Sequence, residues 1–62
     1  MNKVSKCYNA FNTILYTEID GHDFVLESST VDYTEDEIIN EFSELIGVMT
    51  PEEVKRSIIT NS

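Results

Sequence analysis

The chain has 62 residues, of which 12 are Asp or Glu and four are Lys or Arg, giving a formal net charge of −8. So short a chain forms one domain at most, because a domain of this size buries only about 60% of the surface that its unfolded chain exposes. The single cysteine excludes an intrachain disulfide and a Cys-rich zinc site, and the acidic surface makes nucleic acid and anionic membranes poor partners.

Apolar side chains near the N-terminus recur at helical spacing. Val4, Cys7, Tyr8 and Phe11 occupy positions i, i+3, i+4 and i+7. This spacing predicts a helix. Two neighbouring asparagines are weak helix formers, however, so the segment is equally able to extend the strand that follows.

A β-hairpin is predicted in the next segment. Residues 14–19 alternate between two faces, residues 20–23 have turn-forming side chains, and residues 24–27 are again mostly apolar. An isolated hairpin is marginally stable in water, so it needs helices or further strands beside it. Residues 31–33 are a candidate third strand.

The register of this hairpin depends on the turn. A two-residue turn at Asp20-Gly21 sets Glu18 opposite Asp23, and like charges directly opposite each other are unfavourable. A longer turn, with Asp20 opposite Asp23, is therefore preferred. The face predicted to be buried then carries Leu15, Ile19, Phe24 and Leu26.

Two helices are predicted downstream because each begins with the same local motif. Thr34 and Thr50 are each followed three residues later by Glu, which is the pattern of a capping box. The first helix is expected over residues 35–46 and is ended by Gly47, whereas the second is expected over residues 51–60 with Pro at its first position. The core side of the first helix is predicted to carry Ile38, Ile39, Phe42, Leu45 and Ile46.

Together these elements predict an α+β fold in a single small domain, residues 1–62. A β-hairpin or small antiparallel sheet is expected to be covered on one face by the two C-terminal helices. The three tyrosines are interpreted as residues that either close this small core or line an interface.

The distribution of charge gives the main functional hypothesis. All twelve acids lie within residues 18–53, and residues 7–54 contain no Lys or Arg. Glu37, Glu41 and Glu44 form an acidic stripe on the predicted helix, spaced about 6 and 4.5 Å along its axis and opposite its apolar side. Such a stripe is able to mimic the phosphates of nucleic acid. The alternative interpretation is an acidic face that only keeps the chain soluble.

Further acids are predicted to support the stripe. They are Asp20 and Asp23 in the hairpin, and Glu35 and Asp36 in the first turn of the helix. These residues would enlarge a negatively charged surface that attracts a basic partner.

The sequence gives little support for catalysis. His22 lies between two carboxylates, but no second His or Cys accompanies it, and a turn explains these residues more simply. Cys7 is interpreted as a core residue because it lacks an adjacent base. We therefore expect neither an enzyme, nor a cofactor, nor a metal site.

The sequence thus predicts a small acidic protein that inhibits or modulates a partner protein with a basic surface. In size, acidity and lack of catalytic residues it resembles the loose class of small inhibitors encoded by phages and mobile elements, which includes DNA mimics. The resemblance implies a host protein that binds nucleic acid as the target. A cytoplasmic location is expected because neither a signal-peptide pattern nor an apolar run of about 18 residues occurs.

The alternative function is an apolar interaction module, such as a small regulator, an antitoxin or a homodimer. In that case the acids serve solubility only, and binding is almost independent of salt. The interface is then expected to contain Phe42, Ile46, Ile58 and Ile59.

Overall fold

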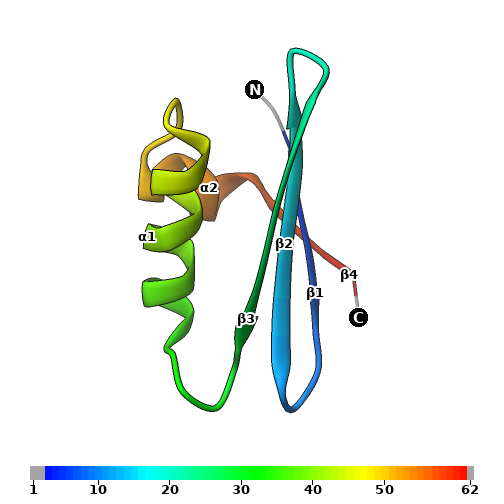
Figure 1. Cartoon of the computed structure of the whole chain (residues 1–62), viewed down its shortest axis with the longest axis vertical. Helices are drawn as coiled ribbons and strands as arrows, with labels where there is room; N and C mark the ends of the chain where they lie inside the picture. Colours follow the sequence, from blue (N-terminus) through cyan, green and yellow to red (C-terminus); the bar gives the residue numbers. More distant parts are fainter. Residues whose placement is uncertain (1–2, 62) are drawn as a thin grey trace.

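The computed structural model describes the backbone of residues 3–61 and the side chains of residues 3–59. A four-stranded mixed sheet and two helices form two layers, with both helices on one face of the sheet (Figure 1). The α+β class is confirmed. In chain order the elements are β1 (Val4–Tyr8), β2 (Asn12–Ile19), β3 (His22–Ser29), α1 (Glu35–Ile46), α2 (Pro51–Ser57) and β4 (Ile58–Asn61).

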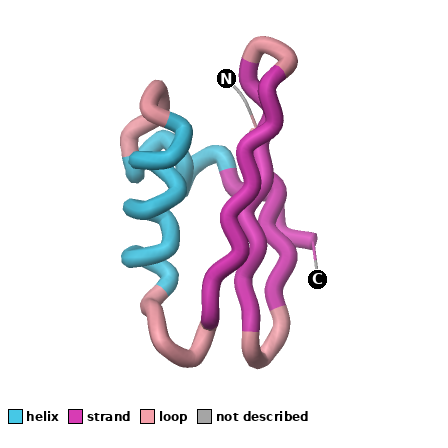
Figure 2. The backbone as a smooth tube through the Cα atoms, in the orientation of Figure 1, coloured by secondary structure: helices cyan, strands magenta, loops and turns pink. Residues whose placement is uncertain are grey.

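The strands lie in the order β3-β2-β1-β4 (Figure 2). The pairs β1–β2 and β2–β3 are antiparallel, whereas β4 runs parallel to β1. A parallel neighbour requires a crossover connection, and here α1 and α2 provide it. Both helices therefore belong to the connection that leads from β3, at one edge of the sheet, to β4 beside β1.

The predicted N-terminal helix is wrong, because the residues from Val4 to Tyr8 form strand β1. This strand lies between β2 and β4, so its backbone hydrogen-bonding groups are used on both sides. Asn9 makes the turn that follows: its side-chain oxygen accepts from the amides of Phe11 and Asn12 at 2.7 and 2.8 Å. Of the two asparagines that weakened the helical prediction, Asn9 thus serves as a turn residue and Asn12 begins β2.

The hairpin is present, but its predicted register is wrong. Glu18 lies opposite Asp23 across a two-residue turn. Asp20 and Gly21 both have positive φ, 51° and 82°, as a type I′ turn requires. This turn matches the twist of the flanking strands, and the twist preference outweighs the repulsion between two exposed carboxylates.

The register error leaves the assignment of faces intact. The observed pairing is shifted by two residues from the predicted pairing. Because side chains in a strand alternate with period two, a shift of two residues leaves each side chain on the same face. The predicted inner residues therefore still point toward the helices: Leu15 is buried, and Ile19, Phe24 and Leu26 are partly buried against the core.

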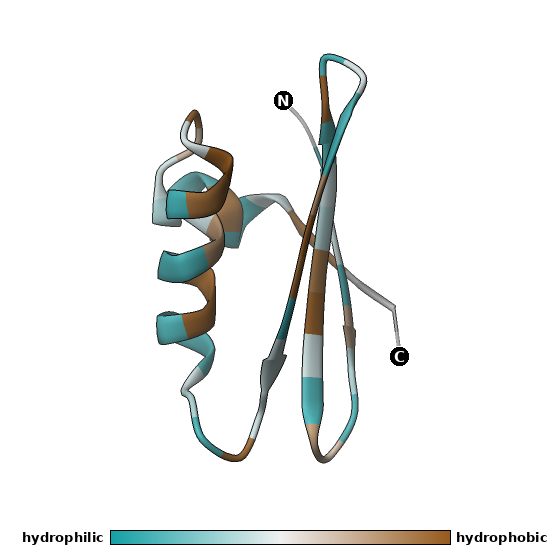
Figure 3. Cartoon of the chain, viewed as in Figure 1, coloured by the Kyte–Doolittle hydropathy of each residue, from teal (hydrophilic) through white to brown (hydrophobic). Residues whose placement is uncertain are grey.

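The core lies between the sheet and the two helices. α1 has the predicted bounds and ends at Gly47, whose φ is 79°, and its apolar side faces the sheet (Figure 3). Leu45 departs from the prediction, since it is exposed at the edge of this side. The buried apolar residues are Val4, Leu15, Ile38, Ile39, Phe42, Ile46 and Val54.

The C-terminal segment also differs from its prediction. α2 begins at Pro51 with the expected capping box but ends at Ser57, and β4 follows without a loop. Ile58 and Ile59 pair with β1, and these β-branched residues suit a strand. The candidate third strand at residues 31–33 is a turn instead, in which the Ser29 hydroxyl accepts from two following amides at 3.2 Å.

Candidate functional site

The acidic stripe lies on the outer surface of α1. Glu37, Glu41 and Glu44 are all exposed, and the buried residues of the helix lie on its opposite side. Figure 3 shows the hydrophilic side of α1 directed away from the sheet. The three carboxylates therefore share one surface that no other element within residues 3–61 covers.

Glu37 has a structural role as well as a place in the stripe. The backbone amide of Thr34 donates to its carboxylate at 2.8 Å, and its own amide donates to the Thr34 hydroxyl at 3.2 Å. The hydrogen bond from the Thr34 amide, with a smaller contribution from the Thr34 side chain, holds the pKa of the Glu37 carboxyl below its usual value. Among the residues that the structure describes, the side chains of Glu41 and Glu44 have neither a hydrogen-bond nor an ion-pair partner. Their carboxylates are therefore unpaired, unlike that of Glu37.

The first-turn acids predicted to support the stripe are paired with lysines. Glu35 forms an ion pair with Lys6 of β1, and Asp36 lies 3.5 Å from the Nζ atom of Lys55 on α2. The Lys6 ammonium also lies 5.1 Å from the centre of the Tyr8 ring. Because their charge is partly compensated, Glu35 and Asp36 contribute less than the stripe itself to a negative surface.

The hairpin acids are not brought together with the stripe. Asp20 lies in the turn between β2 and β3, and Asp23 lies beside Glu18 on the face of the sheet that the helices leave bare. The stripe lies on the outer side of α1, in the layer on the other face of the sheet (Figure 3). The chain thus carries two separate acidic regions on opposite sides.

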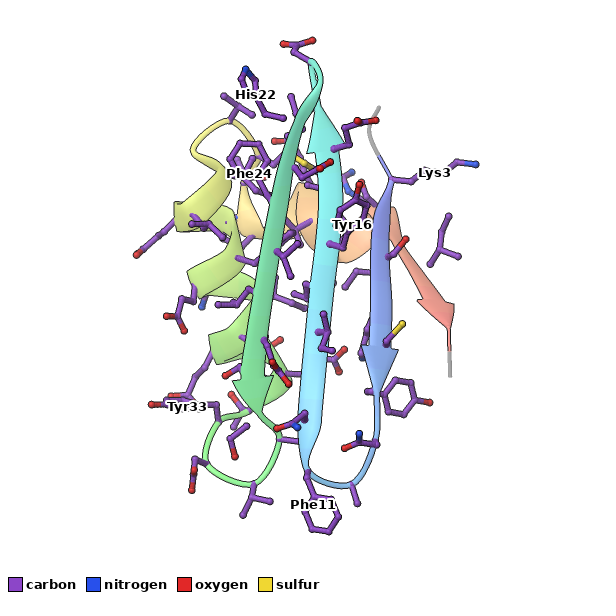
Figure 4. All side chains as sticks on the ribbon, turned by 45° about the vertical axis from the view of Figure 1, so that its right-hand side comes forward. Lys3, Phe11, Tyr16, His22, Phe24 and Tyr33 are labelled. Carbon is purple, nitrogen blue, oxygen red and sulfur yellow. The ribbon has the colours of Figure 1, made fainter. Side chains whose placement is uncertain are left out.

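The bare face of the sheet, here called the open face, also carries apolar side chains. One row of paired residues crosses the four strands in the spatial order Ile59, Ser5, Tyr16 and Val25. In a neighbouring row, Cys7 pairs with Ile14. Figure 4 shows Tyr16 on this face, whereas Phe24 lies on the side of the helices. The sequence signal for this surface was that both faces of β2 carry apolar residues.

Two interpretations of single residues are corrected by this arrangement. Cys7 is exposed on the open face and not in the core, because the inward positions of β1 belong to Val4 and Lys6. The tyrosines do not close the core either, since all three are exposed: Tyr8, Tyr16 and Tyr33.

The interface expected for an apolar module is corrected too. Phe42 and Ile46 are buried beneath the sheet, and Ile58 is partly buried against the same core. Only Ile59 of the expected set is exposed. The apolar sides of the helices are packed in the core and are not available for an interface.

The hydroxyl of Tyr16 donates a hydrogen bond of 2.9 Å to the carboxylate of Asp23. This hydrogen bond, together with the nearby negative charges, raises the pKa of Tyr16 above its usual value of 10.0. A raised pKa favours the neutral phenol in the folded state. The resulting contribution to stability is therefore complete below pH 10 and is lost as the pH rises through the pKa of the folded state.

We expect Asp23→Ala to lower the pKa of Tyr16 toward 10.0, as measured from the ring protons of Tyr16 by NMR across an alkaline titration. Glu27→Ala is the matched control, because it removes an equal charge from the same strand without removing the hydrogen bond. An unchanged pKa in Asp23→Ala would contradict the assigned cause.

A hollow of about 350 Å³ lies between the end of β1 and the start of α1. The Lys6–Glu35 ion pair lies in this hollow, and Tyr8 and Tyr33 line it. Within the described residues, every buried side-chain polar atom has a hydrogen-bond partner. The hollow thus offers a ligand no unpaired buried polar group.

The described residues contain no group of three or more His, Cys, Asp or Glu side chains placed to hold a metal ion. His22, the one histidine, is exposed at the start of β3 (Figure 4). No helix within residues 3–61 is long and apolar enough to cross a membrane.

Comparisons of the chain with family models, curated proteins and solved structures found no match. The candidate site is therefore defined by the charges and geometry of the chain itself.

Proposed function

We propose that the protein binds another protein through the acidic stripe of α1 and thereby inhibits or modulates a partner with a basic surface. The observation that carries this proposal is the exposure of the unpaired Glu41 and Glu44 side chains among the described residues. Both carboxylates are exposed, and both are without partners among the described residues. They are free to meet basic side chains of another molecule.

Helix stability does not account for these two residues. Glu44 lies in the last turn of α1, which contains no base, and a negative charge there faces the negative end of the helix dipole. Glu41 lies one turn from Glu37 and from Glu44, and like charges at this spacing destabilise a helix. By contrast, the acids in the first turn of α1 lie at the positive end of the helix dipole, where a negative charge stabilises the helix. A binding role explains why acids occur at positions where they weaken the helix.

The preferred partner is a protein that handles nucleic acid. The stripe spans about 10 Å along the helix axis, and its carboxylates present successive negative charges to a basic groove as phosphates do. In this proposal the chain mimics DNA in the cytoplasm of a bacterial host and competes with nucleic acid for that groove. Catalysis plays no part.

We expect the double variant Glu41→Gln/Glu44→Gln to lose its partner while keeping its fold. The test captures proteins from bacterial lysate on the tagged chain and elutes them with increasing salt. Since charge pairs provide the attraction, the wild-type partner should leave early in the salt gradient. The double variant should bind at least about tenfold more weakly, as measured with the isolated partner.

The matched control is Glu18→Gln/Glu27→Gln, which removes the same charge from the opposite side of the molecule. This control should retain the partner. Equal loss in both variants would indicate an effect of net charge alone, and a partner that resists salt would contradict the proposal. Thermal unfolding provides an independent check, because removal of Glu41 and Glu44 should stabilise α1 slightly.

A further inference from the structure

The open face combines apolar side chains with a border of acids. The exposed fractions are 37% for Ile14, 39% for Tyr16, 56% for Val25 and 44% for Ile59. The register places the last three in one row across the sheet, with the small residue Ser5 between Ile59 and Tyr16. An open sheet face usually carries polar residues, so an apolar row interrupted only by Ser5 indicates a contact surface.

Tyr16 lies at the centre of this row and is held in place. Its hydroxyl is bonded to Asp23, so the ring has already lost part of its rotational freedom before any partner arrives. Tyrosine is common at the energetic centres of protein interfaces, because a large apolar ring is combined with a polar end. The open face therefore has an anchor residue as well as apolar area.

The charges around the row specify the chemistry of the partner. Glu18, Asp23 and Glu27 belong to the same face as Tyr16, and all three are exposed. Lys3 extends away from the body of the molecule at one margin (Figure 4). A complementary surface has an apolar centre and basic residues at its edge.

A second copy of the chain does not meet this requirement. Each copy would contribute the same three carboxylates to such a contact, so one open face does not offer the other a complementary basic edge. The area is also small. The four strands contain 5, 8, 8 and 4 residues, so the open face offers on the order of 400 Å², whereas stable complexes bury about 800 Å² on each partner.

We infer that the open face is a second protein-binding surface, which forms transient complexes with a partner that is apolar at its centre and basic at its edge. This inference goes beyond the proposed function, since it concerns the opposite side of the molecule and different side chains. The two surfaces allow the chain to contact two proteins at once.

The test uses two defined peptides and the isotopically labelled full chain, with binding mapped by NMR. One peptide alternates Lys with Leu, and the other, of the same length and charge, alternates Lys with Ser. We expect the Lys-Leu peptide to shift the amide signals of Ser5, Tyr16 and Val25. The Lys-Ser peptide should leave these signals unchanged, and any shifts that it causes at Glu41 and Glu44 report on the acidic stripe alone.

The double variant Ile14→Thr/Val25→Thr keeps β-branched side chains in both strands, so the sheet should be retained. It is expected to weaken binding of the Lys-Leu peptide about tenfold. The control Val31→Thr/Val48→Thr makes similar changes at two exposed loop positions and should leave the affinity unchanged.

Three results would overturn the inference. They are an open face unaffected by the Lys-Leu peptide, an equal loss of affinity in the control variant, and sedimentation showing that the wild-type chain dimerises whereas Ile14→Thr/Val25→Thr does not. None of them bears on Glu41 and Glu44, so failure of this inference is distinguishable from failure of the proposed function.

Discussion

The substitution Phe42→Ala should remove most of the protein's free energy of unfolding. Phe42 is fully buried between α1 and the sheet, and truncation of a buried Phe to Ala costs about 3–5 kcal/mol. A domain of this length has a free energy of unfolding of only about 3–9 kcal/mol. Urea denaturation followed by circular dichroism measures the loss directly.

Leu45→Ala is the control for this prediction. Leu45 belongs to the same helix but is 49% exposed, and Ala has the higher helix propensity of the two residues. We expect the free energy of unfolding to change by less than about 1 kcal/mol. Similar losses in the two variants would mean that the core is not centred on Phe42.

The double variant Thr34→Ala/Thr50→Ala should produce the second largest loss. Each threonine hydroxyl accepts the backbone amide three residues later, at 3.2 Å in both helices. Loss of one such cap costs about 1 kcal/mol, and the two caps belong to separate helices, so their costs should add to about 2 kcal/mol. Thermal and urea unfolding measure the sum.

Serine at both positions retains the hydroxyl and is therefore the matched control. Thr34→Ser/Thr50→Ser should unfold at nearly the wild-type urea concentration. If the alanine and serine variants were equally destabilised, the capping hydrogen bonds would not be the cause.

The hairpin shows that a wrong register is compatible with a correct assignment of faces. The charge argument placed Asp20 opposite Asp23, whereas the turn conformation at Asp20-Gly21 sets Glu18 opposite Asp23. Two exposed carboxylates are screened by water, but the backbone twist of a hairpin must be matched by its turn. The alternation of residues still identified the inner side of both strands.

The candidate site was predictable in part. The positions of Glu37, Glu41 and Glu44 on one exposed helix side follow from helical periodicity, which is a local property. The separation of Asp20 and Asp23 from this stripe was not predictable, because it depends on which face of the sheet the helices cover. The open face escaped prediction for the same reason.

The sequence by itself determined the two helix starts, the end of α1, the hairpin and the α+β class. Each depends on side chains that lie within a few residues of one another, as Thr34 and Glu37 do. Only the tertiary structure decided that β1 and β4 are strands. Val4 and Ile58 are 54 positions apart yet are paired in the sheet. Such pairing is stabilised by residues that are distant in the sequence, so a local sequence pattern does not reveal it.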